Sequence, residues 1–128
     1  MIDPAARTIA AYEAAWNEPK RGQRDRLLAE CVSTGVLLSP GYRPDAPELR
    51  GRDALSAEIG SMISSRPPGF QLHFDPRVDA HHAWARFGWR VADASGTLLE
   101  VNNVKIIGMD LVHYSDERTI DTIVVFIG

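Results

Sequence analysis

Hydrophobic residues in the first half of the chain recur at helical spacing. Asp3-Pro4 is typical of a helix start, and apolar side chains then return every three or four positions until Asn17-Glu18-Pro19 ends the helix. Two further helices are predicted over about residues 22–32 and 52–64 by the same spacing. The last of these stops at Arg66-Pro67-Pro68-Gly69, because proline cannot continue a helix.

The second half of the chain alternates apolar and polar residues, as strands do. The predicted strands cover residues 36–39, 70–75, 82–91, 97–114 and 119–127. The alternation is clearest in the third, which puts Ala83, Ala85, Phe87, Trp89 and Val91 on one face and Trp84, Arg86, Gly88 and Arg90 on the other. We expect a turn at residues 93–96 and a bend or bulge at Asn102-Asn103 within one long strand.

Helices followed by a meander of strands predict an α+β fold, and the length fits one domain over residues 1–128. The last two predicted strands are apolar on both faces. Ile107, Met109 and Leu111 oppose Ile106, Val112 and Tyr114, and Ile123, Val125 and Ile127 oppose Val124 and Phe126. Three helices can cover only one side of a curved sheet, so we expect a homodimer in which a second copy covers the other.

Composition excludes several classes of partner. A net charge of −3 gives no electrostatic case for binding nucleic acid. No apolar run approaches the roughly 18 residues of a membrane span, and no basic segment leads into an apolar one as in a signal peptide. The single cysteine, Cys31, fits a reducing compartment, so we expect a cytoplasmic protein.

One acidic residue stands out because its neighbours are apolar. Asp110 lies in Ile107-Gly108-Met109-Asp110-Leu111-Val112, and a buried carboxylate is costly unless it is hydrogen-bonded or kept neutral. It is therefore either a functional acid or base or a structural hydrogen-bond acceptor. Tyr12, on the apolar face of the first helix, is either a second polar group of the same site or a core tyrosine.

The histidines do not predict a metal site. His81 and His82 are adjacent, so on a strand they point to opposite faces and cannot easily share one tetrahedral ion. We expect neither a metal nor a cofactor.

Five short motifs follow one another along the chain. They are Tyr12-x3-Trp16-Asn17, Ser39-Pro40 at the end of a strand, Arg50-Gly51-Arg52-Asp53-Ala54 at the start of the third helix, Val78-Asp79-Ala80-His81-His82 before Arg86-Phe87-x-Trp89, and Gly108-x-Asp110 before the last strand. Their order resembles the nuclear-transport-factor-2-like (NTF2-like) superfamily, especially its SnoaL-like and ketosteroid-isomerase-like members. The resemblance covers nearly the whole chain. It implies a cone-shaped (cystatin-like) fold, in which three N-terminal helices pack on a strongly bent, mostly antiparallel sheet with a pocket at its open end.

The resemblance also implies candidate roles. In ketosteroid isomerases a tyrosine and a protonated aspartate donate hydrogen bonds to the developing enolate oxygen, and Tyr12 and Asp110 match them. Ser39 stands where those isomerases carry their general base, and a serine hydroxyl has little basicity near neutral pH. Related epoxide hydrolases use an Asp-Arg-Asp set, of which only Asp110 has a match here. SnoaL-type cyclases need an acidic residue on the sheet, which Asp110 supplies.

These observations lead to two functional hypotheses. The first is a small-molecule enzyme that transfers protons at a carbonyl, as a cyclase or isomerase does, with Asp110 and Tyr12 as catalytic residues. The second is a non-catalytic ligand-binding or interaction domain on the same fold. In either case the pocket is expected to accept a small apolar or carbonyl-containing molecule. The expected wall residues are Trp16, Ser39, Tyr42, Phe87, Trp89, Ile123 and Val125.

Overall fold

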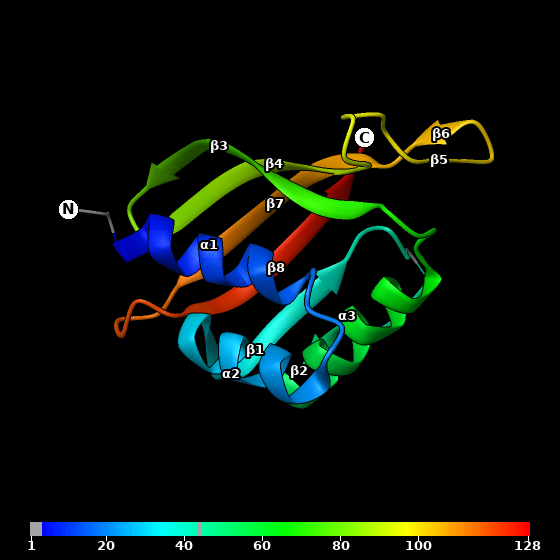
Figure 1. Cartoon of the computed structure of the whole chain (residues 1–128). Helices are drawn as coiled ribbons and strands as arrows, with labels where there is room; N and C mark the ends of the chain where they lie inside the picture. Colours follow the sequence, from blue (N-terminus) through cyan, green and yellow to red (C-terminus); the bar gives the residue numbers. More distant parts are fainter. Residues whose placement is uncertain (1–3, 44) are drawn as a thin grey trace.

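A computed structural model describes residues 4–43 and 45–128 of the chain (Figure 1). The helices are α1 (Pro4–Ala15), α2 (Arg21–Cys31) and α3 (Arg52–Ser65). The strands are β1 (Val32–Pro40), β2 (Leu49–Arg50), β3 (Gln71–His81), β4 (Trp84–Ala92), β5 (Glu100–Val101), β6 (Val104–Lys105), β7 (Ile107–Tyr114) and β8 (Ile120–Ile127). Asp3, the predicted cap of the first helix, lies outside the described residues.

Six strands form one strongly curved sheet in the order β2-β1-β8-β7-β4-β3, and the three helices lie against one face of it (Figure 1). Only the β1–β8 pair is parallel among the described strand pairs. The predicted α+β class, with three helices on a bent and mostly antiparallel sheet, is confirmed.

The alternation in β4 places its side chains as predicted. Ala85, Phe87 and Trp89 are buried on the concave face of the sheet, whereas Trp84 is 43% exposed on the convex face. Two neighbouring strands add Met109 and Phe126 to the convex face, where these cross-strand partners are 41% and 52% exposed. The apolar surface of the last strands is therefore partly exposed on the face that the helices leave uncovered.

The predicted strand over residues 97–114 is wrong. Glu100–Val101 and Val104–Lys105 form a separate hairpin before β7 begins. Its turn residues, Asn102 and Asn103, both have positive φ (53° and 66°), as a type I′ turn requires, and asparagine tolerates that conformation. The two asparagines therefore reverse the chain rather than bend it.

Two other predicted strands are longer in the structure. The expected end at Pro76 is wrong, because β3 continues to His81 and Pro76 lies where the pairing with β4 shifts register. Proline is tolerated there, since β3 is an edge strand and the shift leaves that position unpaired. The strand predicted over 36–39 begins already at Val32, directly after α2.

Glu13 on α1 and Asn17, two residues after this helix, bind the free edge of β3 with their side chains. The Asn17 side-chain amide donates to the Leu72 carbonyl (2.7 Å) and accepts from the Leu72 N–H (2.9 Å), so it replaces a neighbouring strand. One turn earlier, Glu13 Oε2 accepts from the Phe74 N–H (2.6 Å). These bonds satisfy backbone groups at an edge strand and fix where α1 crosses the sheet.

Candidate functional site

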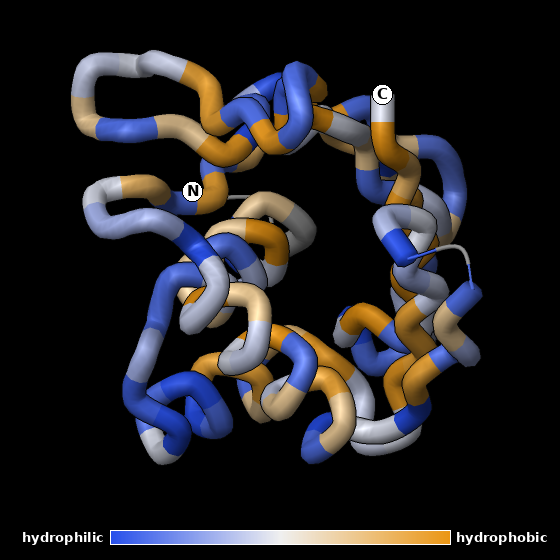
Figure 2. The backbone as a smooth tube through the Cα atoms, turned by 90° about the vertical axis from the view of Figure 1, so that its right-hand side faces the viewer, coloured by the Kyte–Doolittle hydropathy of each residue, from blue (hydrophilic) through white to orange (hydrophobic). Residues whose placement is uncertain are grey.

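A cavity of about 510 Å³ lies between the helices and the concave face of the sheet. Its apolar wall residues are Trp16, Tyr42, Met62, Pro67, Leu72, Trp89, Val91, Leu99, Val101, Ile106, Val125 and Ile127, and its polar ones are Arg43, Ser65, Arg66, Glu100 and Asp110. The segments that carry them meet at the end of the molecule that holds the β5–β6 hairpin and the C-terminus (Figure 2). A volume of this size suits a small organic ligand.

Asp110 lies in the sheet wall of this cavity. Its strand, β7, is central, and Asp110 pairs in register with Phe87 on β4 and Val125 on β8. The residue is 4% exposed, and none of the hydrogen bonds found among the described residues involves its carboxyl group. Burial raises the pKa of Asp110 to about 8. The carboxyl is therefore mostly protonated at neutral pH.

The Trp89 ring lies over Gly108, its cross-strand partner on β7, because glycine has no side chain to occupy that space. A Cβ on Gly108 would overlap the Trp89 ring and the Phe126 carbonyl oxygen, so no larger residue fits without displacing them. The indole N–H lies near enough to Asp110 to oppose the rise in its pKa. Nevertheless, this buried N–H meets no acceptor with hydrogen-bond geometry in the described part of the chain. Gly108 and Trp89 thus shape the wall beside the carboxyl.

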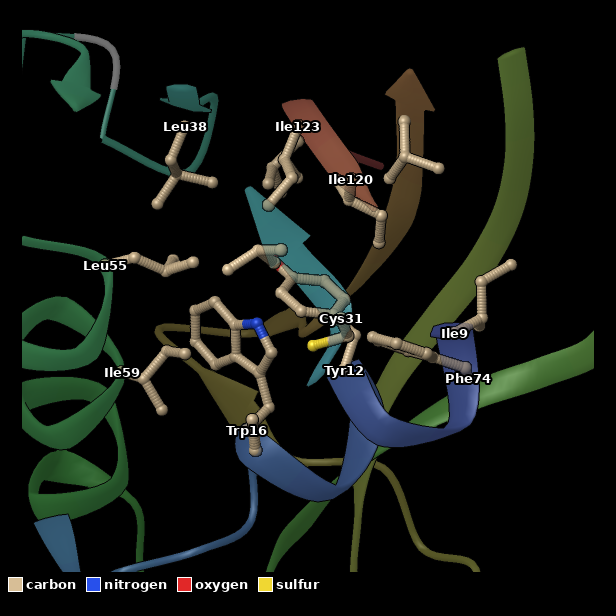
Figure 3. Packing of buried hydrophobic residues seen from close by; sticks show 14 of the residues in the cluster. Ile9, Tyr12, Trp16, Cys31, Leu38, Leu55, Ile59, Phe74, Ile120 and Ile123 are labelled. Atoms are coloured by element: carbon tan, nitrogen blue, oxygen red, sulfur yellow. The ribbon is translucent and has the colours of Figure 1, made fainter. Parts of the chain in front are cut away.

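Tyr12 lies in the core behind the cavity rather than in its wall. Its ring is fully buried against Phe74 and Trp16, whose centroids lie 5.7 and 6.4 Å away, and core side chains enclose it (Figure 3). Burial, and secondarily the charge of Asp110, raise the pKa of the phenol. The hydroxyl has no hydrogen-bond partner among the described residues, Asp110 included. The structure therefore does not join the two predicted catalytic residues by a hydrogen bond.

Four of the seven predicted wall residues reach the cavity. Trp16, Tyr42, Trp89 and Val125 line it. Phe87 and Ile123 face the same side of the sheet but are packed in the core, outside the wall. Ser39 also lies outside the wall, because it pairs with Val124 on β8, and residues that alternate with Val125 point to the convex face.

Sequence reasoning missed a polar network at the rim of the cavity. Glu58 on α3 is 8% exposed, and its two carboxylate oxygens accept from the Tyr42 hydroxyl (2.7 Å) and from Arg43 Nη2 (2.8 Å). Burial and the bond to Glu58 raise the pKa of the Tyr42 phenol, so it stays a donor. The sequence did contain a hint that Glu58 is buried, because this residue directly precedes Ile59 in the apolar stripe of α3.

Arg66 is a second missed residue of the wall. The sequence marked it only as the end of a helix, whereas its side chain lines the cavity beside Trp16 and Pro67. The sequence around Arg66 does not predict its place in the wall, because its hydrogen-bond partners, Trp16 and Asn17, are about fifty residues away along the chain.

His73 and His81 lie near opposite ends of β3, His82 follows that strand, and His113 lies on β7. His113 Nδ1 lies 2.8 Å from Asp121 Oδ1, and the rings of His81 and His82 lie 4.2 Å apart. Within residues 4–43 and 45–128, no group of three or more histidine, cysteine, aspartate or glutamate side chains could hold a metal ion. Over the same residues, no helix is long and apolar enough to cross a membrane.

Comparison with known proteins gives fold relatives only. No protein-family model matches the chain, and no curated protein matches its sequence. Among solved structures, a SnoaL-like family protein from Agrobacterium tumefaciens strain C58, provisionally assigned as an isomerase, superposes with a TM-score of 0.75. It is 24% identical, and the match covers 94% of each chain.

Two further structures show the same arrangement. An NTF2-like protein of unknown function from Exiguobacterium sp. 255-15 is 12% identical, with a TM-score of 0.68 over 94% of this chain and 98% of its own. SalBIII, an epoxide hydrolase/cyclase-like enzyme of pyran ring formation in salinomycin, is 17% identical, with a TM-score of 0.66 over 94% and 88%. The predicted resemblance is thus confirmed in the fold, and the chain adopts the NTF2-like fold of the SnoaL-like proteins.

Proposed function

We propose that this protein binds a small, largely apolar molecule with a carbonyl group, and that Asp110 transfers protons at that carbonyl. One oxygen of the carboxyl gives its proton to the carbonyl oxygen while the other takes up the α-proton, so the ketone becomes an enol and the carboxyl is left protonated. The observation that supports this proposal is the Asp110 carboxyl: it lines an apolar cavity, is 4% exposed, and has its pKa raised by burial to about 8 although the Trp89 indole opposes the rise. A carboxyl that keeps its proton in an apolar cavity has a hydrogen-bond donor to offer, and the carbonyl oxygen of a ligand would accept it.

The chemistry of a neutral carboxyl fits this role. With a pKa of about 8, the protonated form of Asp110 exceeds the ionised form by about tenfold at pH 7. Such a group can donate a hydrogen bond to a carbonyl oxygen and stabilise the negative charge that grows there during enolisation or aldol closure. The fold relatives include an enzyme described as epoxide hydrolase/cyclase-like, which is compatible with this class of reaction.

Catalysis is tested by the exchange of α-protons on a ketone. Propiophenone in D₂O is the probe, and NMR follows loss of the α-proton signal. We expect the protein to accelerate the exchange, Asp110→Asn to lose the acceleration, and Asp116→Asn, which changes an exposed aspartate, to keep it. The rate should also fall as pH rises through about 8, where Asp110 loses its proton.

The alternative is a binding protein without catalysis, favoured by the absence of a carboxylate at Ser39 and by the distance of Tyr12 from the wall. Under this alternative, Asp110 serves only as a hydrogen-bond donor to the ligand. Propiophenone would then bind, more weakly to Asp110→Asn, but its α-protons would exchange no faster than in buffer.

A homodimer through the convex face of the sheet is part of the proposal. Met109 and Phe126 are cross-strand neighbours there and are largely exposed, next to the partly buried Leu111 and Val124. A contiguous apolar patch of this kind is typical of an interface. The buried, unpaired Cys31 is compatible with the predicted cytoplasmic location.

A further inference from the structure

Arg66 is held at the cavity by the way α3 ends. Pro67 follows it and restricts the residue before it to extended backbone, and Arg66 accordingly has φ −74° and ψ 142°. The chain turns away from the helix at this point, and the half-buried Arg66 side chain lines the helix side of the cavity.

Two hydrogen bonds fix the plane of the Arg66 guanidinium. Nη1 donates to Asn17 Oδ1 (2.9 Å) and Nη2 donates to the Trp16 carbonyl oxygen (2.6 Å). Both acceptors are uncharged. A guanidinium has five N–H donors, so these two bonds leave three, including Nε–H, without an acceptor in the described part of the chain. The group is therefore oriented but not neutralised.

The other charged groups of the wall do not compensate this cation. Arg43 already pairs with Glu58 at 2.8 Å, and Asp110 is mostly uncharged at neutral pH. Glu100 lies on the exposed β5–β6 hairpin and forms no ion pair among the described residues. Burial without an anion lowers the pKa of Arg66, the direction expected of a desolvated cation.

We infer that the ligand of this cavity carries a carboxylate, which Arg66 binds at the helix wall while the carbonyl of the same molecule meets Asp110 at the sheet wall. This inference rests on the proposed function for the position of the carbonyl. A planar guanidinium with three free donors matches a carboxylate, and a charge-assisted pair of this kind is about twice as strong as a hydrogen bond between neutral groups. The ligand class is thus a keto acid with an apolar body between its two polar groups.

The competing explanation is purely structural. Arg66 bonds the carbonyl at the end of α1, where a cation also interacts favourably with the helix dipole. A cap of this kind stabilises the protein equally with any ligand. The test must therefore compare two ligands within one variant, so that a general loss of stability cancels.

The probes are 3-benzoylpropionate and its methyl ester, which share the ring and the ketone and differ in charge. Binding is measured by calorimetry at pH 7 for the wild type, Arg66→Gln and Arg77→Gln. Arg77 is exposed on β3 outside the cavity wall, so its variant matches the change in net charge. We expect the wild type and Arg77→Gln to bind the acid about tenfold to a hundredfold more tightly than the ester, and Arg66→Gln to bind both alike.

Several outcomes would overturn the inference. It fails if the wild type binds neither probe, binds the ester as tightly as the acid, or keeps its preference in Arg66→Gln. If Arg66→Gln does not fold, NMR of the wild type decides: the Arg66 Nε–H signal should shift with the acid and not with the ester, and equal shifts refute the inference. Asp110→Asn separates it from the proposed function, because a failed acid role at Asp110 leaves the preference for the carboxylate intact.

Discussion

Replacing Asp110 by asparagine should remove a large pH dependence from the stability of this protein. In the folded state the carboxyl keeps its proton up to about pH 8, whereas in the unfolded chain it ionises near the ordinary aspartate pKa of 3.8. Between these values the folded state binds more protons than the unfolded state, so the free energy of unfolding falls as pH rises. Asparagine has nearly the same shape and cannot ionise.

The magnitude follows from the difference between the two pKa values. Each pH unit between about 4 and 8 lowers the wild-type free energy of unfolding by about 1.4 kcal/mol through this group. At pH 7 the loss amounts to about 4 kcal/mol, from a pKa that moves from 3.8 to about 8. This figure is an upper bound, because Asp110 lines a cavity and water that enters it would hydrate the carboxylate.

The assay is urea unfolding at pH 4, 5, 6, 7 and 8 for the wild type, Asp110→Asn and the exposed control Asp116→Asn. We expect Asp110→Asn to match the wild type near pH 4 and to become progressively more stable than it toward pH 8. The control should follow the wild type throughout, since its carboxyl is solvated in both states.

Two results would refute this reasoning. Parallel curves for the wild type and Asp110→Asn would mean that the carboxyl ionises in the folded protein as it does in the unfolded chain. A variant that is unfolded at every pH would mean that Asp110 accepts hydrogen bonds that hold the sheet together, and the functional interpretation of the residue would fail with it.

Four further changes test the packing and the assembly. Tyr12→Phe should keep or raise the free energy of unfolding, because its hydroxyl has no partner among the described residues; a loss above about 1 kcal/mol in urea would show a hydrogen bond. Asn17→Ala should cost about 1–3 kcal/mol in the same assay, since two bonds to the β3 backbone disappear, and an unchanged midpoint would contradict the edge contact. Gly108→Ala should lower Tm and shift the tryptophan fluorescence, because the new Cβ displaces Trp89; unaltered emission would argue against that contact. Phe126→Glu should keep the circular dichroism spectrum and give monomers by light scattering where the wild type gives dimers, and equal masses for the two would oppose the proposed interface.

Local sequence determined most of the elements of this protein. Apolar spacing predicted three helices, and the Arg66-Pro67 step ended α3 because the residue before proline prefers extended backbone. The alternation in β4 predicted which side chains face the core, since side chains along a strand alternate between its two faces whatever strand pairs with it. The hairpin at Asn102-Asn103 was missed as a bend within one long strand, although two asparagines in succession suit the positive φ of a type I′ turn.

The tertiary structure alone decided the composition of the site. Pairing of β1 with β8, more than eighty residues apart along the chain, turned Ser39 away from the cavity. The crossing of α1 over β3, fixed by Asn17, enclosed Tyr12 in the core and brought Trp16 to the wall. The sequence by itself indicated that Asp110 is buried among apolar neighbours. Its carboxyl faces a cavity whose wall also carries Arg66, a half-buried arginine without an acid partner. This arrangement depends on contacts between segments far apart in the chain, and local periodicity carries no information about such contacts.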